Sequence, residues 1–80
     1  MLDAVDHGGE MRVRVTGSRI DAAIATRFKD KLRETIVRHR KPVEMRMRAV
    51  EFMDSSGLSA LIGVLRQARG RGVTVSFAGF

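Results

Sequence analysis

An apolar run passes into an amphipathic segment at Glu51-Phe52-Met53-Asp54-Ser55-Ser56-Gly57-Leu58. The join holds one carboxylate, two adjacent hydroxyls and a glycine, and such small polar residues are common at the start of a helix. Backbone N–H groups are unpaired at that end, and the helix dipole favours negative charge there. A serine at this place therefore has two roles open to it. It can cap the helix, or it can accept a phosphoryl group whose charge the dipole would tolerate.

The segments around this turn alternate between strand and helix patterns. Apolar residues recur at every second position over residues 11–15 and again over 43–47, as in strands with one buried face. A short strand at 2–5 and the glycines at 8 and 9 predict an antiparallel hairpin with the first of these strands. The alternation shifts near Ala49, which predicts a bulge or short turn. Residues 73–77 form the last expected strand.

Two helices are expected between these strands. The first runs from Ala22 to about His39, with Asp21 as its N-cap and Pro42 just beyond its end. The second begins at the Asp54–Gly57 turn. Its predicted buried stripe consists of Leu58, Leu61, Ile62, Leu65 and Ala68.

The resulting order, β-β-α-β-α-β, predicts an α/β fold with a four-stranded mixed sheet and helices packed on it. The strand–helix–strand units imply right-handed crossovers between parallel strands, and the first hairpin adds an antiparallel edge. We expect a single domain over residues 1–80. Two helices are few for covering such a sheet, so either a further segment or a partner is expected to cover part of its surface.

The composition limits the chemistry and the partners that are expected. The chain has no cysteine, and His7 and His39 lie far apart without ligand-type neighbours, so no metal or other cofactor is expected. The formal net charge of +6 suits an acidic protein, anionic lipid or nucleic acid. The absence of tryptophan and tyrosine disfavours direct nucleic-acid binding. There is no apolar run of ~20 residues and no signal-peptide pattern, so a cytoplasmic protein without a membrane span is expected.

The segment Phe52-Met53-Asp54-Ser55-Ser56-Gly57-Leu58 resembles the signature of STAS domains, and specifically that of bacterial anti-sigma factor antagonists. Gly17-x-x-Ile20-Asp21-Ala22 is similar to the segment before the family's first long helix, and Gly72-Val73-Thr74-Val75 to the start of its fourth strand. The resemblance runs from about residue 10 to residue 77. It implies the STAS fold and a chain that is C-terminally short, since the family's following helix is missing.

In antagonists of this family, the serine directly after the aspartate is phosphorylated by the anti-sigma factor, which is itself a serine kinase. The resemblance therefore makes Ser55 the phosphoacceptor. It implies that the unphosphorylated domain binds the anti-sigma factor, that phosphorylation releases it, and that a phosphatase resets it. The partner-binding residues implied in this way are Asp21, Asp54, Ser55, Ser56, Gly57 and Leu58. A homo-oligomer is a further partner left open.

One position departs from the family pattern. Members commonly carry an aspartate on the third strand, where this sequence has Arg46 with Arg48 nearby. A guanidinium there could change how a kinase reads the site, or pair with a phosphate once it is present.

Two other functions stay open beside the phosphorylated antagonist. One is an accessory STAS subunit of a lipid or anion transport complex, with Ser55 only as a helix cap. In the phosphorylated antagonist, by contrast, Ser56 is expected to be the structural hydroxyl, which caps the helix or bonds locally. The other is a hydrolase that uses Ser55 or Ser56 as its nucleophile. The second is disfavoured because neither histidine lies near the motif as a general base, and the chain is predicted not to be an enzyme.

Overall fold

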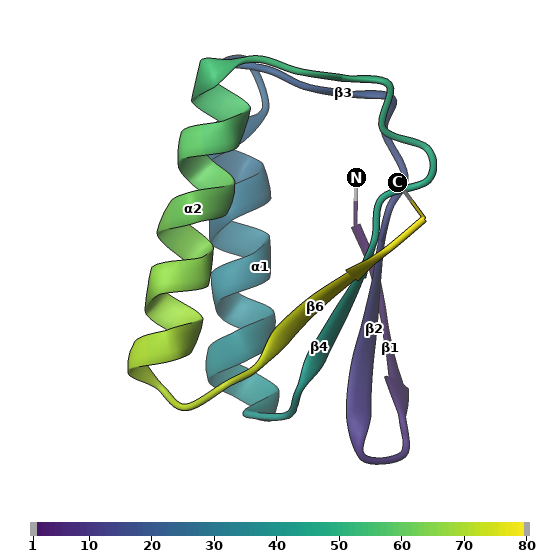
Figure 1. Cartoon of the computed structure of the whole chain (residues 1–80), viewed down its shortest axis with the longest axis vertical. Coiled ribbons are helices and arrows are strands. Elements are labelled where there is room, and N and C mark those ends of the chain that lie inside the picture. The colour runs from purple at the N-terminus through teal and green to yellow at the C-terminus, as the bar shows by residue number, and fades with distance from the viewer. Residues whose placement is uncertain (1, 80) are drawn as a thin grey trace.

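A four-stranded sheet is covered on one face by two helices in the computed structural model, which describes residues 2–79 (Figure 1). The strand order is β1-β2-β4-β6, with β1 antiparallel to β2 and the other neighbours parallel. The predicted fold class is confirmed. The strands are β1 (Leu2–His7), β2 (Glu10–Val15), β4 (Val43–Arg46) and β6 (Val75–Ala78), and the helices are α1 (Ala25–His39) and α2 (Ser55–Gly70).

The alternation of the strands separates an apolar face from a charged one. Val13 and Met45 face each other across β2 and β4, and both are buried against the helices. Phe28 of α1 is fully buried in the same core. The alternate positions of β2 and β4 leave the other face of the sheet to charged side chains: Arg12, Arg14, Glu44 and Arg46. Within residues 2–79, no helix is long and apolar enough to cross a membrane.

The start of α1 differs from the prediction. The helix begins at Ala25 rather than Ala22, and its N-cap position is Ile24, which makes no side-chain capping bond. The Asp21 carboxylate accepts a hydrogen bond from the Ala23 N–H at 3.1 Å, and the Asp21 carbonyl accepts from the Ala25 N–H at 2.9 Å. Asp21 therefore closes a turn that leads into the helix, because its side chain reaches the backbone two residues ahead.

The buried face of α2 also differs from the prediction. Leu58 and Ile62 are 51% and 42% exposed, so the predicted stripe is wrong at these two positions. The buried residues of α2 are small: Gly57, Ala60, Val64 and Ala68. Small side chains on this face let α2 lie close to its neighbours, and the larger leucine and isoleucine side chains are turned outward as a result.

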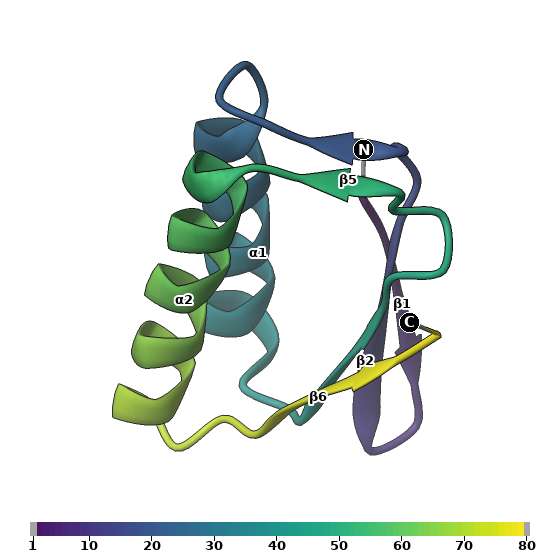
Figure 2. The same ribbon diagram turned by 45° about the horizontal axis from the view of Figure 1, so that its top comes forward.

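A second, two-stranded sheet was not predicted. The short strands β3 (Arg19–Ile20) and β5 (Phe52–Met53) pair in parallel and connect the sheet layer to the helix layer (Figure 2). They carry the chain into α1 and α2 respectively. The expected turn near Ala49 is present, since the Val50 N–H bonds to the Met47 carbonyl at 3.0 Å. Two-residue strands are too short to leave a periodic signal, so the alternation rule could not find them.

An exposed ion pair ties the β1–β2 hairpin to the connection between α1 and β4. The Lys41 ammonium lies 2.7 Å from the Asp6 carboxylate and 3.3 Å from the Gly8 carbonyl oxygen. The hydrogen bond from Lys41 holds the pKa of the Asp6 carboxyl below its ordinary value. The contact therefore stabilises the fold above the unfolded-state pKa of Asp6, and this contribution is lost as the pH falls through the folded-state pKa.

We expect Asp6→Asn to unfold at a slightly lower urea concentration than the wild type at pH 7. The difference should shrink when the measurement is repeated at acidic pH, because the wild-type carboxylate becomes protonated as the pH falls through its folded-state pKa. Asp30→Asn, at an exposed position of α1, serves as the control for loss of a carboxylate without an ion pair. A deficit of Asp6→Asn that stays the same at both pH values would show that the charge of Asp6 is not its source.

Candidate functional site

The candidate site is the N-terminus of α2, where Asp54 caps the helix. Asp54 has extended backbone geometry, and its Oδ1 accepts a hydrogen bond from the Gly57 N–H at 3.0 Å. Its carbonyl accepts the first helical bond, from the Leu58 N–H at 2.9 Å. Asp54 is thus the N-cap of α2. The carboxylate satisfies one of the unpaired donors at this end of the helix and places a negative charge at the positive end of its dipole.

The same carboxylate also holds the segment before α1. Its Oδ2 accepts a hydrogen bond from the Ala22 N–H at 3.2 Å, and the Asp54 N–H donates to the Ile20 carbonyl at 3.3 Å. One side chain thus bonds both the start of α2 and a backbone group 32 residues earlier in the sequence. Asp21 is next to Ala22, so the structure brings the two motifs of the sequence together.

A cation–π contact reinforces this junction. The Arg19 guanidinium lies 4.4 Å from the centre of the Phe52 ring, across the β3–β5 pair. Arg19 also lies 3.6 Å from the Asp21 carboxylate. Sequence reasoning missed the roles of Arg19 and Phe52, because the contact depends on a pairing of two short strands that no local pattern indicates.

Ser55 is the first residue of α2 and is exposed, while Ser56 is half-buried. Neither hydroxyl makes a hydrogen bond within residues 2–79. The alternative in which Ser55 is the helix cap is therefore wrong, and so is the local bond expected of Ser56. Asp54 performs the capping, which leaves the Ser55 hydroxyl accessible and without a structural role.

Gly57 is buried because another part of the backbone passes close to it. A Cβ atom at this position would lie 2.9 Å from Ile20 Cγ2 and 2.9 Å from Met53 Cγ, and closer still to the Ile20 carbonyl oxygen. No side chain fits into this space. The contact of Gly57 is thus with its own chain, so any contribution of this residue to partner binding is indirect.

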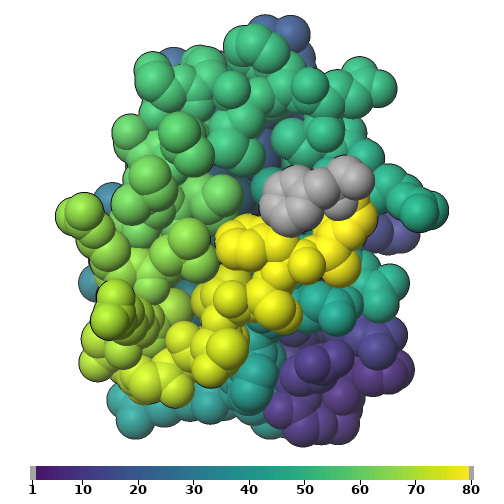
Figure 3. Space-filling model, in the orientation of Figure 1, coloured from purple at the N-terminus to yellow at the C-terminus, as the bar shows by residue number. Residues whose placement is uncertain are grey.

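Exposed apolar side chains flank the serines on both sides. Phe52, three residues before Ser55, is 44% exposed, and Leu58 and Ile62 lie one helical turn apart on the outer side of α2. Figure 3 shows the outer side of α2 as one uncovered flank of the molecule. We call Phe52, Leu58 and Ile62 the apolar rim of the site. Neighbouring exposed apolar side chains are typical of a protein-binding surface.

Two features considered in the sequence lie away from this site. Arg46 is on the face of the sheet that the helices leave open, and its guanidinium donates to Glu44 at 2.8 Å. His39 ends α1, at the opposite end of the helix layer from the start of α2, and His7 ends β1 (Figure 1). Neither histidine is placed to activate Ser55. Among residues 2–79, no three histidine, aspartate or glutamate side chains are arranged to hold a metal ion.

We expect Gly57→Ala to lower the free energy of unfolding by at least about 2 kcal/mol, because the added methyl group displaces the Ile20 backbone. Gly63→Ala is the matched control in the same helix, where a Cβ atom would lie 3.6 Å from Lys29 Cε. That change should be neutral or stabilising by up to about 1 kcal/mol, since alanine favours the helix. Urea unfolding of the two variants measures both effects. Equal stabilities would contradict the close packing at Gly57.

Comparison with known proteins places this geometry in a family. The model of the STAS domain family matches residues 1–80. A protein named Mglu has a similar structure, with a TM-score of 0.80 and 19% identity over 94% of this chain and 18% of that protein. The anti-sigma factor antagonist SpoIIAA in its unphosphorylated form gives a TM-score of 0.73 and 16% identity, over 96% of this chain and 71% of SpoIIAA. SpoIIAA of Bacillus in its phosphorylated form is also similar.

The murine anion transporter Slc26a9 contains a similar region, with a TM-score of 0.74 and 19% identity over 91% of this chain and 12% of the transporter. This chain thus spans less than a fifth of Mglu and of Slc26a9, and about seven tenths of SpoIIAA. Identities this low show the shared fold alone. The family match, together with this fold, shows that the chain belongs to the STAS domain family.

Proposed function

We propose that this STAS domain is a regulatory protein-binding domain of the anti-sigma factor antagonist type, with Ser55 as its phosphorylation site. The observation that carries the proposal is the state of Ser55: it is exposed, it makes no hydrogen bond within residues 2–79, and it starts α2 beside a cap supplied by Asp54. A kinase needs an accessible hydroxyl whose modification does not break the fold, and Ser55 meets both needs.

The apolar rim supports binding of the unmodified domain to a protein. Phe52, Leu58 and Ile62 give a partner apolar surface to bury around the serine. In the proposed interface Asp21, Asp54 and Ser56 supply polar contacts, while Gly57 keeps the junction in place from inside. The proposed partners are an anti-sigma factor with serine kinase activity and a phosphatase that reverses the modification, in the cytoplasm.

A phosphate on Ser55 would oppose this binding. It adds a charge of roughly −1.5 to −2, and burying that charge against an apolar partner surface is unfavourable. Inside the domain, the neighbouring Asp54 carboxylate repels the phosphate, and the N-terminus of α2 must offset this cost. Within the domain the phosphate is tolerated, because the free N–H groups and the dipole at the start of α2 favour an anion. Phosphorylation therefore acts on the interface more than on the fold.

A second function fits the same surface. The likeness to a region of an anion transporter favours a STAS domain that serves as an accessory part of a membrane transport complex. In that case the apolar rim binds a transport component and Ser55 stays unmodified. The two functions differ in whether a kinase modifies Ser55 and in the identity of the protein bound.

Incubation with ATP and a candidate anti-sigma factor kinase from the same genome should add a single mass of about 80 Da, the mass of one phosphate. Intact-mass spectrometry should show the shift in the wild type and in Ser56→Ala, and not in Ser55→Ala. A mass shift lost only in Ser56→Ala would show that Ser56 is the phosphorylated residue and would contradict the proposal for Ser55. No shift with any such kinase, together with capture of a transport component, would favour the accessory function.

Ser55→Asp should fold like the wild type, since a carboxylate is favoured in the first turn of a helix. It should bind the anti-sigma factor at least about tenfold more weakly, a difference of about 1.4 kcal/mol. Ser55→Ala is the control and should bind like the wild type, because it removes the acceptor without adding charge. Equal affinities of the aspartate and alanine variants would contradict a switch that works through charge at this position.

A further inference from the structure

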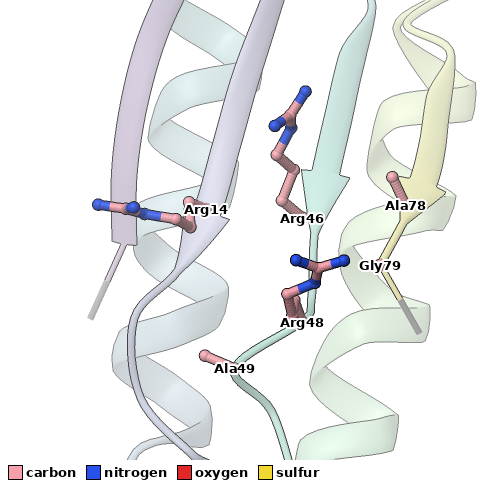
Figure 4. A pocket seen from close by; sticks show the side chains of 6 residues that line it. All are labelled: Arg14, Arg46, Arg48, Ala49, Ala78 and Gly79. Atoms are coloured by element: carbon pink, nitrogen blue, oxygen red, sulfur yellow. The ribbon is translucent and has the colours of Figure 1, made fainter.

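The face of the sheet that the helices leave open contains a hollow lined by three arginines. Arg14 of β2, Arg46 of β4 and Arg48 of the following turn surround it, with a volume of about 570 Å³ (Figure 4). The remaining lining residues are small: Ala49, Ala78 and Gly79. Among residues 2–79, no carboxylate lines the hollow. We call these three side chains the arginine cluster.

The strand register forces two of these arginines together. Arg14 and Arg46 are direct partners on the neighbouring strands β2 and β4, and the next residue across, on β6, is Ala78. Like charges in directly opposite positions destabilise a sheet. Asp3 of β1 is the partner of Arg14 in the same row and offsets part of this cost, while the side of the row toward Ala78 has no carboxylate within residues 2–79.

Each side chain of this pair turns away from the other. Arg14 extends over β1 to Asp3, with a distance of 2.9 Å, and the Nε of Arg46 donates to Glu44 at 2.8 Å (Figure 4). The bond from Arg46 holds the pKa of the Glu44 carboxyl below its ordinary value. Arg48 has no hydrogen-bond or ion-pair partner within residues 2–79. Most of the donors of the three guanidinium groups are thus unused, since each group carries five N–H donors.

We propose that the arginine cluster binds an oxyanion of the phosphate class. Planar guanidinium forks match the oxygen geometry of phosphate and form short, charge-assisted hydrogen bonds with it. An anion between Arg14 and Arg46 would also remove the repulsion that the register imposes. The side chains of Arg14 and Arg46 are 68% and 47% exposed, so both are free to turn toward a ligand. The ion pairs they would give up are exposed and contribute little to stability.

The surroundings favour a small ligand over an extended polyanion. Asp3, Glu10 and Glu44 are interspersed with the arginines on the same face of the sheet. A flat anionic membrane or a nucleic acid laid across this face would meet these carboxylates as well. A small oxyanion in the hollow would contact the arginines alone. The low walls formed by Ala49, Ala78 and Gly79 leave room for it to approach the backbone.

This site is independent of the proposed function. The arginine cluster lies on the open face of the sheet, whereas Ser55 starts a helix that covers the opposite face. Binding of an oxyanion therefore requires no phosphorylation of Ser55. Failure of one proposal leaves the other unaffected.

Titration of the whole chain with inorganic phosphate and with pyrophosphate, at ionic strength held constant with sodium chloride, tests the proposal. Backbone amide shifts in NMR spectra should saturate at residues 48–49 and 78–79. The double variant Arg46→Gln with Arg48→Gln should bind each of the two anions at least tenfold more weakly than the wild type. The matched control, Arg33→Gln with Arg66→Gln, removes the same charge from exposed positions on α1 and α2 and should leave the affinity within about twofold.

Arg48→Gln alone removes no intramolecular ion pair, so it tests the cluster without disturbing the fold. It should weaken phosphate binding several-fold. Equal weakening in the matched control, or equal shifts with chloride, would overturn the proposal, since the effect would then come from net charge. Binding to vesicles that contain phosphatidic acid without any response to free phosphate would also overturn it, in favour of a membrane surface.

Discussion

The close contact between Gly57 and the Ile20 backbone is the constraint on which the rest of this structure depends. It brings the start of α2 against the chain that leads into α1, at a distance that only glycine permits. The Asp54 carboxylate fixes the same junction from the side, through its bonds to Gly57 and Ala22. Two segments that lie more than 30 residues apart are thus held together by the close approach that Gly57 permits and by the hydrogen bonds of the Asp54 carboxylate.

The exposed surface of α2 follows from this contact. Because Gly57 must face Ile20, the positions that share its side of the helix, Ala60 and Val64, are also turned inward. The rotation of the helix is then set, and Leu58 and Ile62 are directed outward although they are more apolar than the buried alanine. The exposure of the two α2 residues of the apolar rim, Leu58 and Ile62, is therefore a geometric consequence of a close backbone contact inside the domain.

Periodicity in the sequence was enough to predict the main strands and both helices, since each spans several residues of a clear pattern. The motif around Ser55 was also enough to place that serine at the start of α2. The orientation of α2 could not be predicted in this way. Hydrophobicity favours burial of Leu58, whereas close packing of the helix against its neighbours favours small residues on the buried face. The arginine cluster could not be predicted from the sequence for another reason. Arg14 and Arg46 are 32 positions apart, and only the register of β2 against β4 makes them neighbours.

The division of roles between Asp54 and Ser55 would allow the proposed phosphorylation of Ser55 without loss of the helix cap. A serine that capped its own helix would lose that bond on phosphorylation, and modification would then destabilise the fold together with the interface. Here the neighbouring Asp54 makes the capping bond, and the Ser55 hydroxyl makes no hydrogen bond within residues 2–79. In a chain of 80 residues, where stability is limited, this separation would let the proposed phosphorylation alter binding while the fold is kept.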